Sequence, residues 1–172
     1  MEYQRSAEYL NANEHGREWK IEWISSLPYD DLSKCMGAEE LEELQMWELE
    51  NSVSRAVIAS ESPNYAQGEF QTESHRNLKI EETEEEITVY THVLYRVYDK
   101  PMELTAQGMH PVILMFNKSG LGTYELKEYQ TPYSHPGMEE EFPNEFYVSP
   151  YRDLMEEECD ENAAMYYWDY NY

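Results

Sequence analysis

The stretch ITVYTHVLYRVY, from Ile87 to Tyr98, carries the strongest secondary-structure signal in this sequence. Successive residues fall alternately into two sets, and a period of two is that of a β-strand that shows different residues on its two faces. The first set is Ile87, Val89, Thr91, Val93, Tyr95 and Val97, and the second is Thr88, Tyr90, His92, Leu94, Arg96 and Tyr98. We therefore predict one long strand over 87–98.

Further strands are predicted on both sides of this stretch. Residues 75–82 alternate between apolar and charged side chains and form the preceding strand. Residues 111–129, PVILMFNKSGLGTYELKEY, contain a strand, a turn with glycines and a return strand. The run over 99–110 is expected to be a flexible connection, so that the next strand begins at Pro111. Together these strands predict an antiparallel meander.

A long helix is predicted before the sheet, over residues 38–60, where the composition is strongly helical. An apolar stripe with spacings of three and four should pack on the sheet. That stripe is Met46, Leu49, Val53, Ala56 and Val57. On the opposite side lie Leu44, Trp47 and Ile58. The N-terminal segment is favoured over a partner protein as the cover of this second side.

The two ends of the chain are predicted to carry shorter elements. Residues 1–27 suit a helix with its apolar side chains on one face, although the alternation within 19–23 equally suits a short strand. At the other end, a helix is expected over 151–167, with Leu154 and Met155 as its apolar contacts.

These elements place the chain in the α+β class, with one long helix packed on an antiparallel sheet of about four strands and helical or irregular N- and C-terminal segments. The length of 172 residues predicts a single domain, 1–172. Its parts are an N-terminal helical segment over 1–37, the helix and the meander over 38–131, and an acidic, aromatic tail over 132–172.

Charge is the outlying property of the composition. The chain has 36 acidic and 12 basic residues, a formal net charge of -24. Such a chain repels nucleic acid and anionic membranes and is attracted to basic surfaces. Its 16 tyrosines and four tryptophans distinguish it from disordered acidic chains, which are poor in aromatic residues. We therefore predict a folded protein that does not bind nucleic acid directly.

The sequence also bears on the compartment of the protein. Its N-terminus lacks the basic and apolar regions of a signal peptide, and no run of about 18 apolar residues occurs. We predict no membrane span, and a cytoplasmic location unless a signal has been removed. Cys35 and Cys159 are expected to be two reduced thiols in preference to one long-range disulfide.

Residues from about 53 to 151 resemble a known domain. The segments that carry the resemblance are VSRAVIAS, GEFQTESHRNLKIEETEEEITVYTHVLYRVYD, HPVILMFNKSGLGTYELKEYQTP and MEEEFP, in this order and spacing. They look like the non-catalytic C-terminal extracytoplasmic region attached to membrane metallopeptidases of the beta-lactam-sensor antirepressor type. The HExxH motif and the membrane helices of that family are absent, so its zinc chemistry cannot be carried over to any residue here.

No catalytic motif stands out in the chain. Histidines occur at 15, 75, 92, 110 and 135, and no pair has the spacing of a helical zinc site. The GLG at 120–122 lacks the Lys-Ser/Thr ending of a phosphate-binding loop, and GxSxG is missing. We therefore predict a protein that is not an enzyme and has neither a metal site nor a cofactor.

Acidic and aromatic side chains are instead the candidates for partner binding. Carboxylates can form ion pairs with the lysines and arginines through which a DNA-binding protein otherwise holds DNA. One acidic group surrounds Thr83 at the predicted hairpin tip and consists of Glu81, Glu82, Glu84, Glu85 and Glu86. The tail supplies Glu139, Glu140, Glu141, Glu156, Glu157, Glu158, Asp160 and Glu161. Its aromatic residues Tyr166, Tyr167, Trp168, Tyr170 and Tyr172 are either interface anchors or part of the core.

The leading hypothesis is a non-enzymatic inhibitor of a basic nucleic-acid-handling protein, of the anti-CRISPR or DNA-mimicking antidefence type. The alternatives are an extracytoplasmic ligand-sensing or envelope-associated domain, which the family resemblance implies, and an immunity protein against a toxin nuclease.

Overall fold

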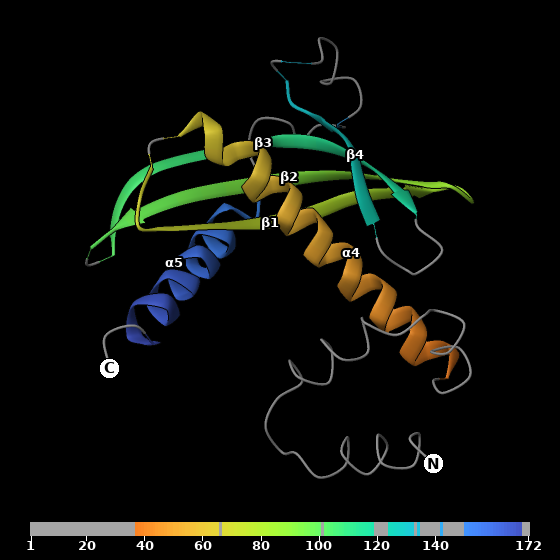
Figure 1. The fold of residues 1–172 in the computed structure, drawn as a ribbon, viewed down its shortest axis with the longest axis horizontal. Helices are drawn as coiled ribbons and strands as arrows, with labels where there is room; N and C mark the ends of the chain where they lie inside the picture. The colour runs from red at the N-terminus through yellow and green to blue at the C-terminus, as the bar shows by residue number, and fades with distance from the viewer. Residues whose placement is uncertain are drawn as a thin grey trace. The chain divides into compact units, whose positions relative to one another are not determined.

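The structure is a computed structural model that describes residues 37–65, 67–100, 102–118, 124–132, 134, 142 and 150–169. They form the helices α4 (Ala38–Glu61) and α5 (Arg152–Asp169), the short 3-10 helix η1 (Ser62–Asn64) and four strands (Figure 1). The strands are β1 (Phe70–Glu82), β2 (Glu86–Asp99), β3 (Glu103–Lys118) and β4 (Tyr124–Gln130). The predicted elements over 1–27 and the predicted turn at Gly120 and Gly122 lie outside the described residues.

The chain divides into two compact units, Met1–Met46 and Trp47–Tyr172. Of the first unit the structure describes only residues 37–46, which are mainly the first part of α4. The second unit contains the rest of α4, the whole sheet and α5.

The four strands form one antiparallel sheet in the order β1-β2-β3-β4, which confirms the predicted α+β class and meander (Figure 1). The acidic run does form the tip between β1 and β2. There the Thr83 N–H donates to the Glu86 carbonyl at 2.9 Å, and the Glu86 N–H donates to Thr83 Oγ1 at 3.0 Å. These reciprocal bonds close the turn and set the register of the hairpin.

The predicted connection over 99–110 is wrong for most of its length, because β3 begins at Glu103. Strand β3 pairs with β2 from Asp99↔Glu103 to Glu86↔Asn117, so the connection shrinks to a tight turn in which Met102 has a φ of 67°. Buried peptide groups need hydrogen-bond partners, and a long β2 therefore requires an equally long neighbour. The polar run ELTAQG at the start of β3 does not by itself indicate a strand.

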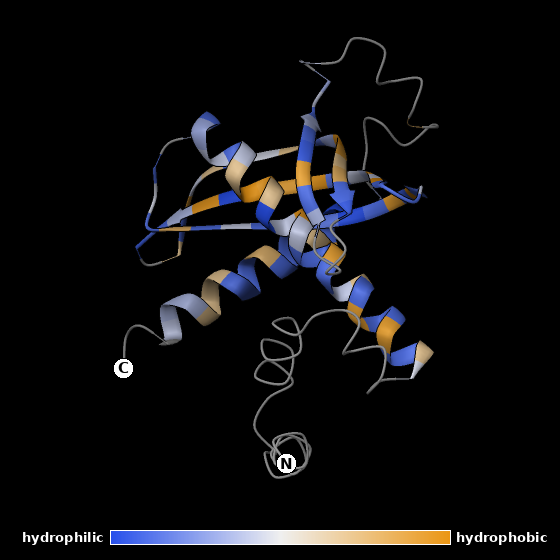
Figure 2. Cartoon of the chain, turned by 45° about the vertical axis from the view of Figure 1, so that its right-hand side comes forward, coloured by the Kyte–Doolittle hydropathy of each residue, from blue (hydrophilic) through white to orange (hydrophobic). Residues whose placement is uncertain are grey.

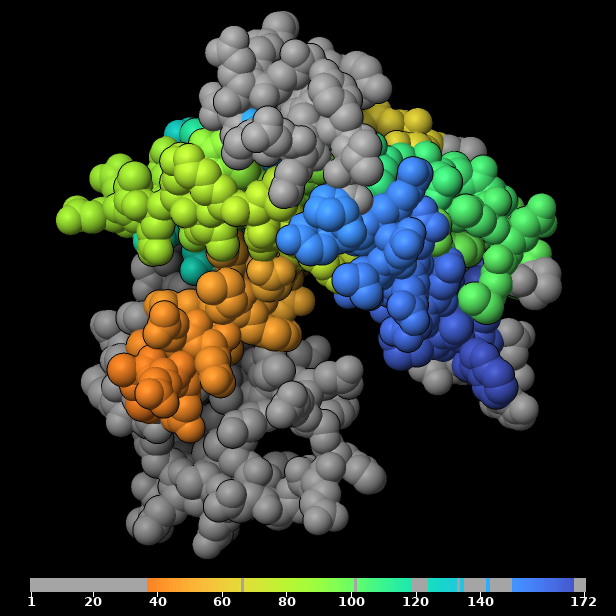
Figure 3. Space-filling model, turned by 180° about the vertical axis from the view of Figure 1, so that it is seen from behind, coloured from red at the N-terminus to blue at the C-terminus, as the bar shows by residue number. Residues whose placement is uncertain are grey.

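The two helices cover opposite faces of the sheet (Figures 1 and 3). Residues of the first set along β2 face α4, where Val89 and Val93 are fully buried against Val53 and Val57. In the second set, Leu94 and Tyr98 pack against α5, and Tyr90 packs against Phe142 on the same face. Figure 2 shows the resulting concentration of apolar residues along the middle of the sheet. A strand covered on both sides explains why β2 is buried almost from end to end.

Each helix has one predicted contact that the structure places in solvent. In α4 the buried stripe begins at Leu49, and Met46 is 51% exposed. In α5 Met155 is buried but Leu154 is 53% exposed. The buried stripe of α5 recurs at every fourth residue: Met155, Cys159, Ala163 and Tyr167. Alanine and cysteine carry little apolar weight in a sequence pattern, so this stripe is hard to recognise without the sheet.

Cys159 provides a direct measure of α5 docking, because its free thiol is buried against Leu94 and Met155. Burial raises the pKa of this thiol to about 12. Since the thiolate is the reactive form, alkylation at pH 8 should be slower than for an exposed cysteine by on the order of a thousandfold. The measurement is the alkylation rate in a Cys35→Ser variant, so that only Cys159 reports.

The matched control carries Glu161→Cys, Cys159→Ser and Cys35→Ser, which moves the only thiol to an exposed position of the same helix. Equal alkylation rates in the two proteins would contradict a docked α5.

Candidate partner-binding surface

The carboxylates at the hairpin tip are partly neutralised by lysines of the same sheet. Lys79, Lys118 and Lys127 pair with Glu81, Glu82 and Glu86, respectively. The hydrogen bond from Lys79 lowers the pKa of Glu81. The remaining two predicted tip residues, Glu84 and Glu85, are exposed. The tip is therefore a mixed-charge surface, and a weak source of negative potential for a partner.

Three of the five predicted carboxylates within α5 point toward the sheet. Glu158 pairs with Arg76 and accepts a hydrogen bond from Ser74 Oγ at 2.6 Å. The hydrogen bond from Arg76 lowers the pKa of Glu158. Glu156 and Asp160 pair with Arg96 at 3.1 and 2.9 Å. These carboxylates hold α5 on the sheet.

Arg96 is the centre of this attachment and is only 5% exposed. Besides its two carboxylate partners, it donates from Nε to Gln107 Oε1 at 3.2 Å. The Tyr98 hydroxyl donates to the same Asp160 oxygen at 2.5 Å. Burial and the bond to Asp160 raise the pKa of Tyr98 well above its usual value. Our sequence reasoning missed Arg96 as a functional candidate, although a single arginine in a buried strand is the signal that could have found it.

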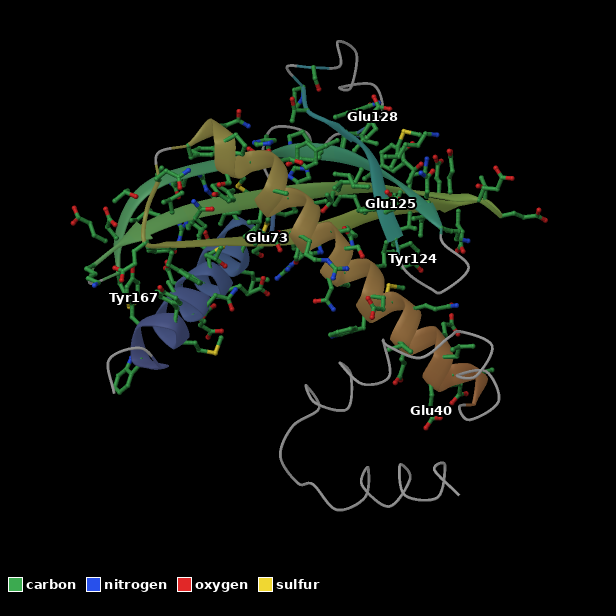
Figure 4. The ribbon with its side chains drawn as sticks, in the orientation of Figure 1. Glu40, Glu73, Tyr124, Glu125, Glu128 and Tyr167 are labelled. Carbon is green, nitrogen blue, oxygen red and sulfur yellow. The ribbon has the colours of Figure 1, made fainter. Side chains whose placement is uncertain are left out.

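The tail aromatics divide between the two sides of α5. Tyr166 stacks on Phe70 with ring centroids 4.4 Å apart. Tyr167, labelled in Figure 4, is buried beside Tyr98. Trp168 is instead 67% exposed. The two tyrosines thus belong to the core, and only the tryptophan is available to a partner. Tyr170, Tyr172 and the predicted candidates Glu139, Glu140 and Glu141 lie outside the described residues.

The outer face of α5 is the surface that remains. We define it by the exposed residues Asp153, Leu154, Glu157, Glu161, Met165 and Trp168. The three carboxylates recur every four residues and form a row with a spacing of about 6 Å along the helix axis. In Figure 3, α5 lies in blue at the front of the molecule. The only basic residue of the helix, Arg152, pairs with Glu156 instead.

The opposite face of the sheet contains a buried ionic cluster under α4. His75 Nε2 lies 2.7 Å from Glu50, and Nδ1 lies 3.1 Å from Glu73. Two carboxylates can both be hydrogen-bonded only if both ring nitrogens donate, so His75 is an imidazolium. Burial by itself would lower the pKa of His75, but the two carboxylates outweigh it and raise the pKa to about 9. Glu73, labelled in Figure 4, also accepts from Ser54 at 2.5 Å.

A second buried cluster lies at the end of α4. The Glu61 side chain is only 3% exposed, accepts from Tyr129 Oη at 2.5 Å and bonds His110 Nε2 at 2.9 Å. Burial favours a raised pKa for Glu61, but these hydrogen bonds outweigh it and lower the pKa. Every side chain named in the two clusters is engaged with another one. Both clusters therefore fasten α4 and the segment after it to the sheet.

Neither cluster has the geometry of a metal centre. No group of three or more His, Cys, Asp or Glu in the described part of the chain is arranged to hold a metal ion. In the same residues, no helix has the length and apolar character needed to cross a membrane.

Comparisons of the chain with protein-family models, with curated proteins and with solved structures find no match. The class of the protein therefore rests on its own fold and surface: an acidic α+β protein with a four-stranded antiparallel sheet between two helices.

Proposed function

We propose that this protein is a non-enzymatic inhibitor that binds a basic nucleic-acid-handling protein, in the manner of anti-CRISPR and other DNA-mimicking antidefence proteins. The observation that carries the proposal is the outer face of α5. Its carboxylates Asp153, Glu157 and Glu161 are exposed on a helix whose inward carboxylates have already taken up Arg76 and Arg96. Arg152, the only basic residue of this helix, pairs with Glu156 instead of with the outward row.

Electrostatics gives this surface a preferred class of partner. With a formal net charge of -24, the protein is attracted to clefts lined by lysine and arginine. Such clefts normally hold the phosphate backbone of a nucleic acid. A protein that occupies one of these clefts prevents the nucleic acid from binding there, and it needs no catalytic activity to do so.

The proposal is tested by immobilising the full chain and capturing partners from a bacterial lysate at low salt. Elution with a duplex DNA oligonucleotide should release a nucleic-acid enzyme, which mass spectrometry identifies. The biological role of the released enzyme would separate an antidefence inhibitor from an immunity protein. Release of envelope proteins, or of nothing, would refute the proposal.

Charge neutralisation on the outer face should weaken binding of the captured enzyme. Changing Asp153 to Asn and both Glu157 and Glu161 to Gln removes three exposed charges, and we expect affinity to fall about tenfold at low salt. The difference should vanish at high salt, where exposed charges are screened. A matched control neutralises the exposed Glu125 and Glu128 of β4. Equal affinities of the two variants would remove α5 from the electrostatic contact.

A further inference from the structure

The outer face of α5 contains more than charge. Leu154, Met165 and Trp168 are 53%, 59% and 67% exposed, which makes them the three most exposed large apolar side chains among the described residues. All three lie on the same side of the helix as Asp153, Glu157 and Glu161, because residues separated by three, four or seven positions share one helical face. Tryptophan in particular is the residue most enriched among the anchors of protein interfaces.

The charge pattern identifies the occupant of this face. A second copy of the chain would pair the surface with itself, since a two-fold interface brings identical patches together. Such contact would place the acidic row of one copy against that of the other, and like charges in contact repel. A basic protein surface meets the same row with attraction. It also buries the apolar residues, provided that it offers a hollow beside its lysines and arginines.

We propose that α5 inserts its outer face into the basic cleft of the partner, with Trp168 and Met165 as the apolar anchors and the row Asp153, Glu157 and Glu161 facing lysines and arginines. This inference rests on the proposed function. It adds where the contact lies on this chain and which side chains govern each rate of binding. The carboxylates steer the encounter and govern the association rate. The anchors fill a hollow in the cleft and govern the dissociation rate.

The kinetics of binding to the captured enzyme test this division. Trp168→Ala should raise the dissociation rate about tenfold or more and leave the association rate within about twofold. The triple charge variant should instead lower the association rate and reduce its dependence on salt. Leu126→Ala is the matched control, because Leu126 is 37% exposed on β4 and its cross-strand partner Phe116 belongs to the core on the α4 side of the sheet. A Trp168→Ala variant with unchanged dissociation would overturn the assignment of the anchor.

Photo-crosslinking of the full chain locates the contact independently. A benzophenone amino acid at Met165, with the same group at Leu126 as the control, is irradiated in the lysate with and without excess duplex DNA. We expect crosslinks only from position 165, to a lysine- and arginine-rich peptide of the captured enzyme, and their loss when DNA is present. Retained alkylation protection of Cys159 shows that each labelled chain is folded.

The other outcomes separate this inference from the proposed function. Crosslinks to a second copy, or to another segment of the same chain, would overturn the inference because that segment or copy is then the occupant. Crosslinks to the enzyme only from position 126 would overturn it as well, while the proposed function stands. Absence of crosslinks from both positions, together with a capture that yields no nucleic-acid enzyme, would overturn both.

Discussion

Replacement of Arg96 with alanine is expected to lower the free energy of unfolding by about 2–4 kcal/mol and to release α5 from the sheet. Arg96 is 5% exposed and is bonded to Glu156 and Asp160. Its removal takes the cation from Asp160 and leaves Glu156 with Arg152 alone. Both carboxylates retain access to water, which keeps the loss below that of a fully buried pair. Asp160 also accepts a hydrogen bond from the Tyr98 hydroxyl, and this bond would no longer be flanked by the charge of Arg96.

Two measurements report this effect. Urea unfolding gives the change in stability, and the alkylation rate of Cys159 reports the opening of α5. Arg152→Ala is the matched control, since Arg152 is exposed and makes one pair with Glu156 within the helix, for which a cost of about 0.5 kcal/mol or less is expected. Stability of Arg96→Ala equal to that of the control would show that the buried arginine does not hold the helix.

The second large effect is expected at His75, whose replacement with alanine should cost about 3 kcal/mol at pH 6. The side chain of Glu73 is only 5% exposed and would lose the imidazolium of His75, keeping a hydrogen bond from Ser54. Glu50 is 44% exposed and would recover its hydration. His75→Gln keeps a hydrogen-bonding side chain without the charge, so an intermediate loss is expected. Equal stability of the alanine variant and the native chain in urea would contradict the ionic cluster.

The same cluster predicts how stability depends on pH. The pKa of His75 is raised from 6.5 in the unfolded chain to about 9 in the folded one. Its contribution is therefore complete below pH 6.5 and is lost as the pH rises to about 9, with a total on the order of 3 kcal/mol. Urea unfolding between pH 6 and 9 should show this decline in the native chain and a flatter profile in His75→Gln. Parallel profiles would show that His75 is not charged in the fold.

Local patterns account for most of the fold. Alternation along 87–98 specifies a strand, and its two sets of side chains correspond to the two faces of β2 in the structure. The apolar stripe that contains Leu49, Val53 and Val57 likewise specifies the buried side of α4. Such patterns are readable because each depends on neighbours a few residues away. The first half of β3 had no comparable pattern, since its pairing partner β2 supplies the reason for its extended form.

The residues of the candidate surface could be predicted only in part from local sequence patterns. Acidity and aromatic content pointed to the tail, but a run such as EEECDE places carboxylates around most of a helix. Which of them face the sheet depends on Arg76 and Arg96, more than sixty residues away from some of their partners along the chain. The structure assigns Glu156, Glu158 and Asp160 to attachment and leaves Glu157 and Glu161 on the outer face.

The class of fold, the strongly acidic character and the central strand could all be predicted without a structure, because composition and short-range periodicity are properties of the chain alone. The division of the tail residues into those that attach α5 and those on its outer face required the folded structure. Inward and outward sides of a helix are defined by what packs against it, and the ion pairs that orient α5 join residues brought together only when the sheet has formed.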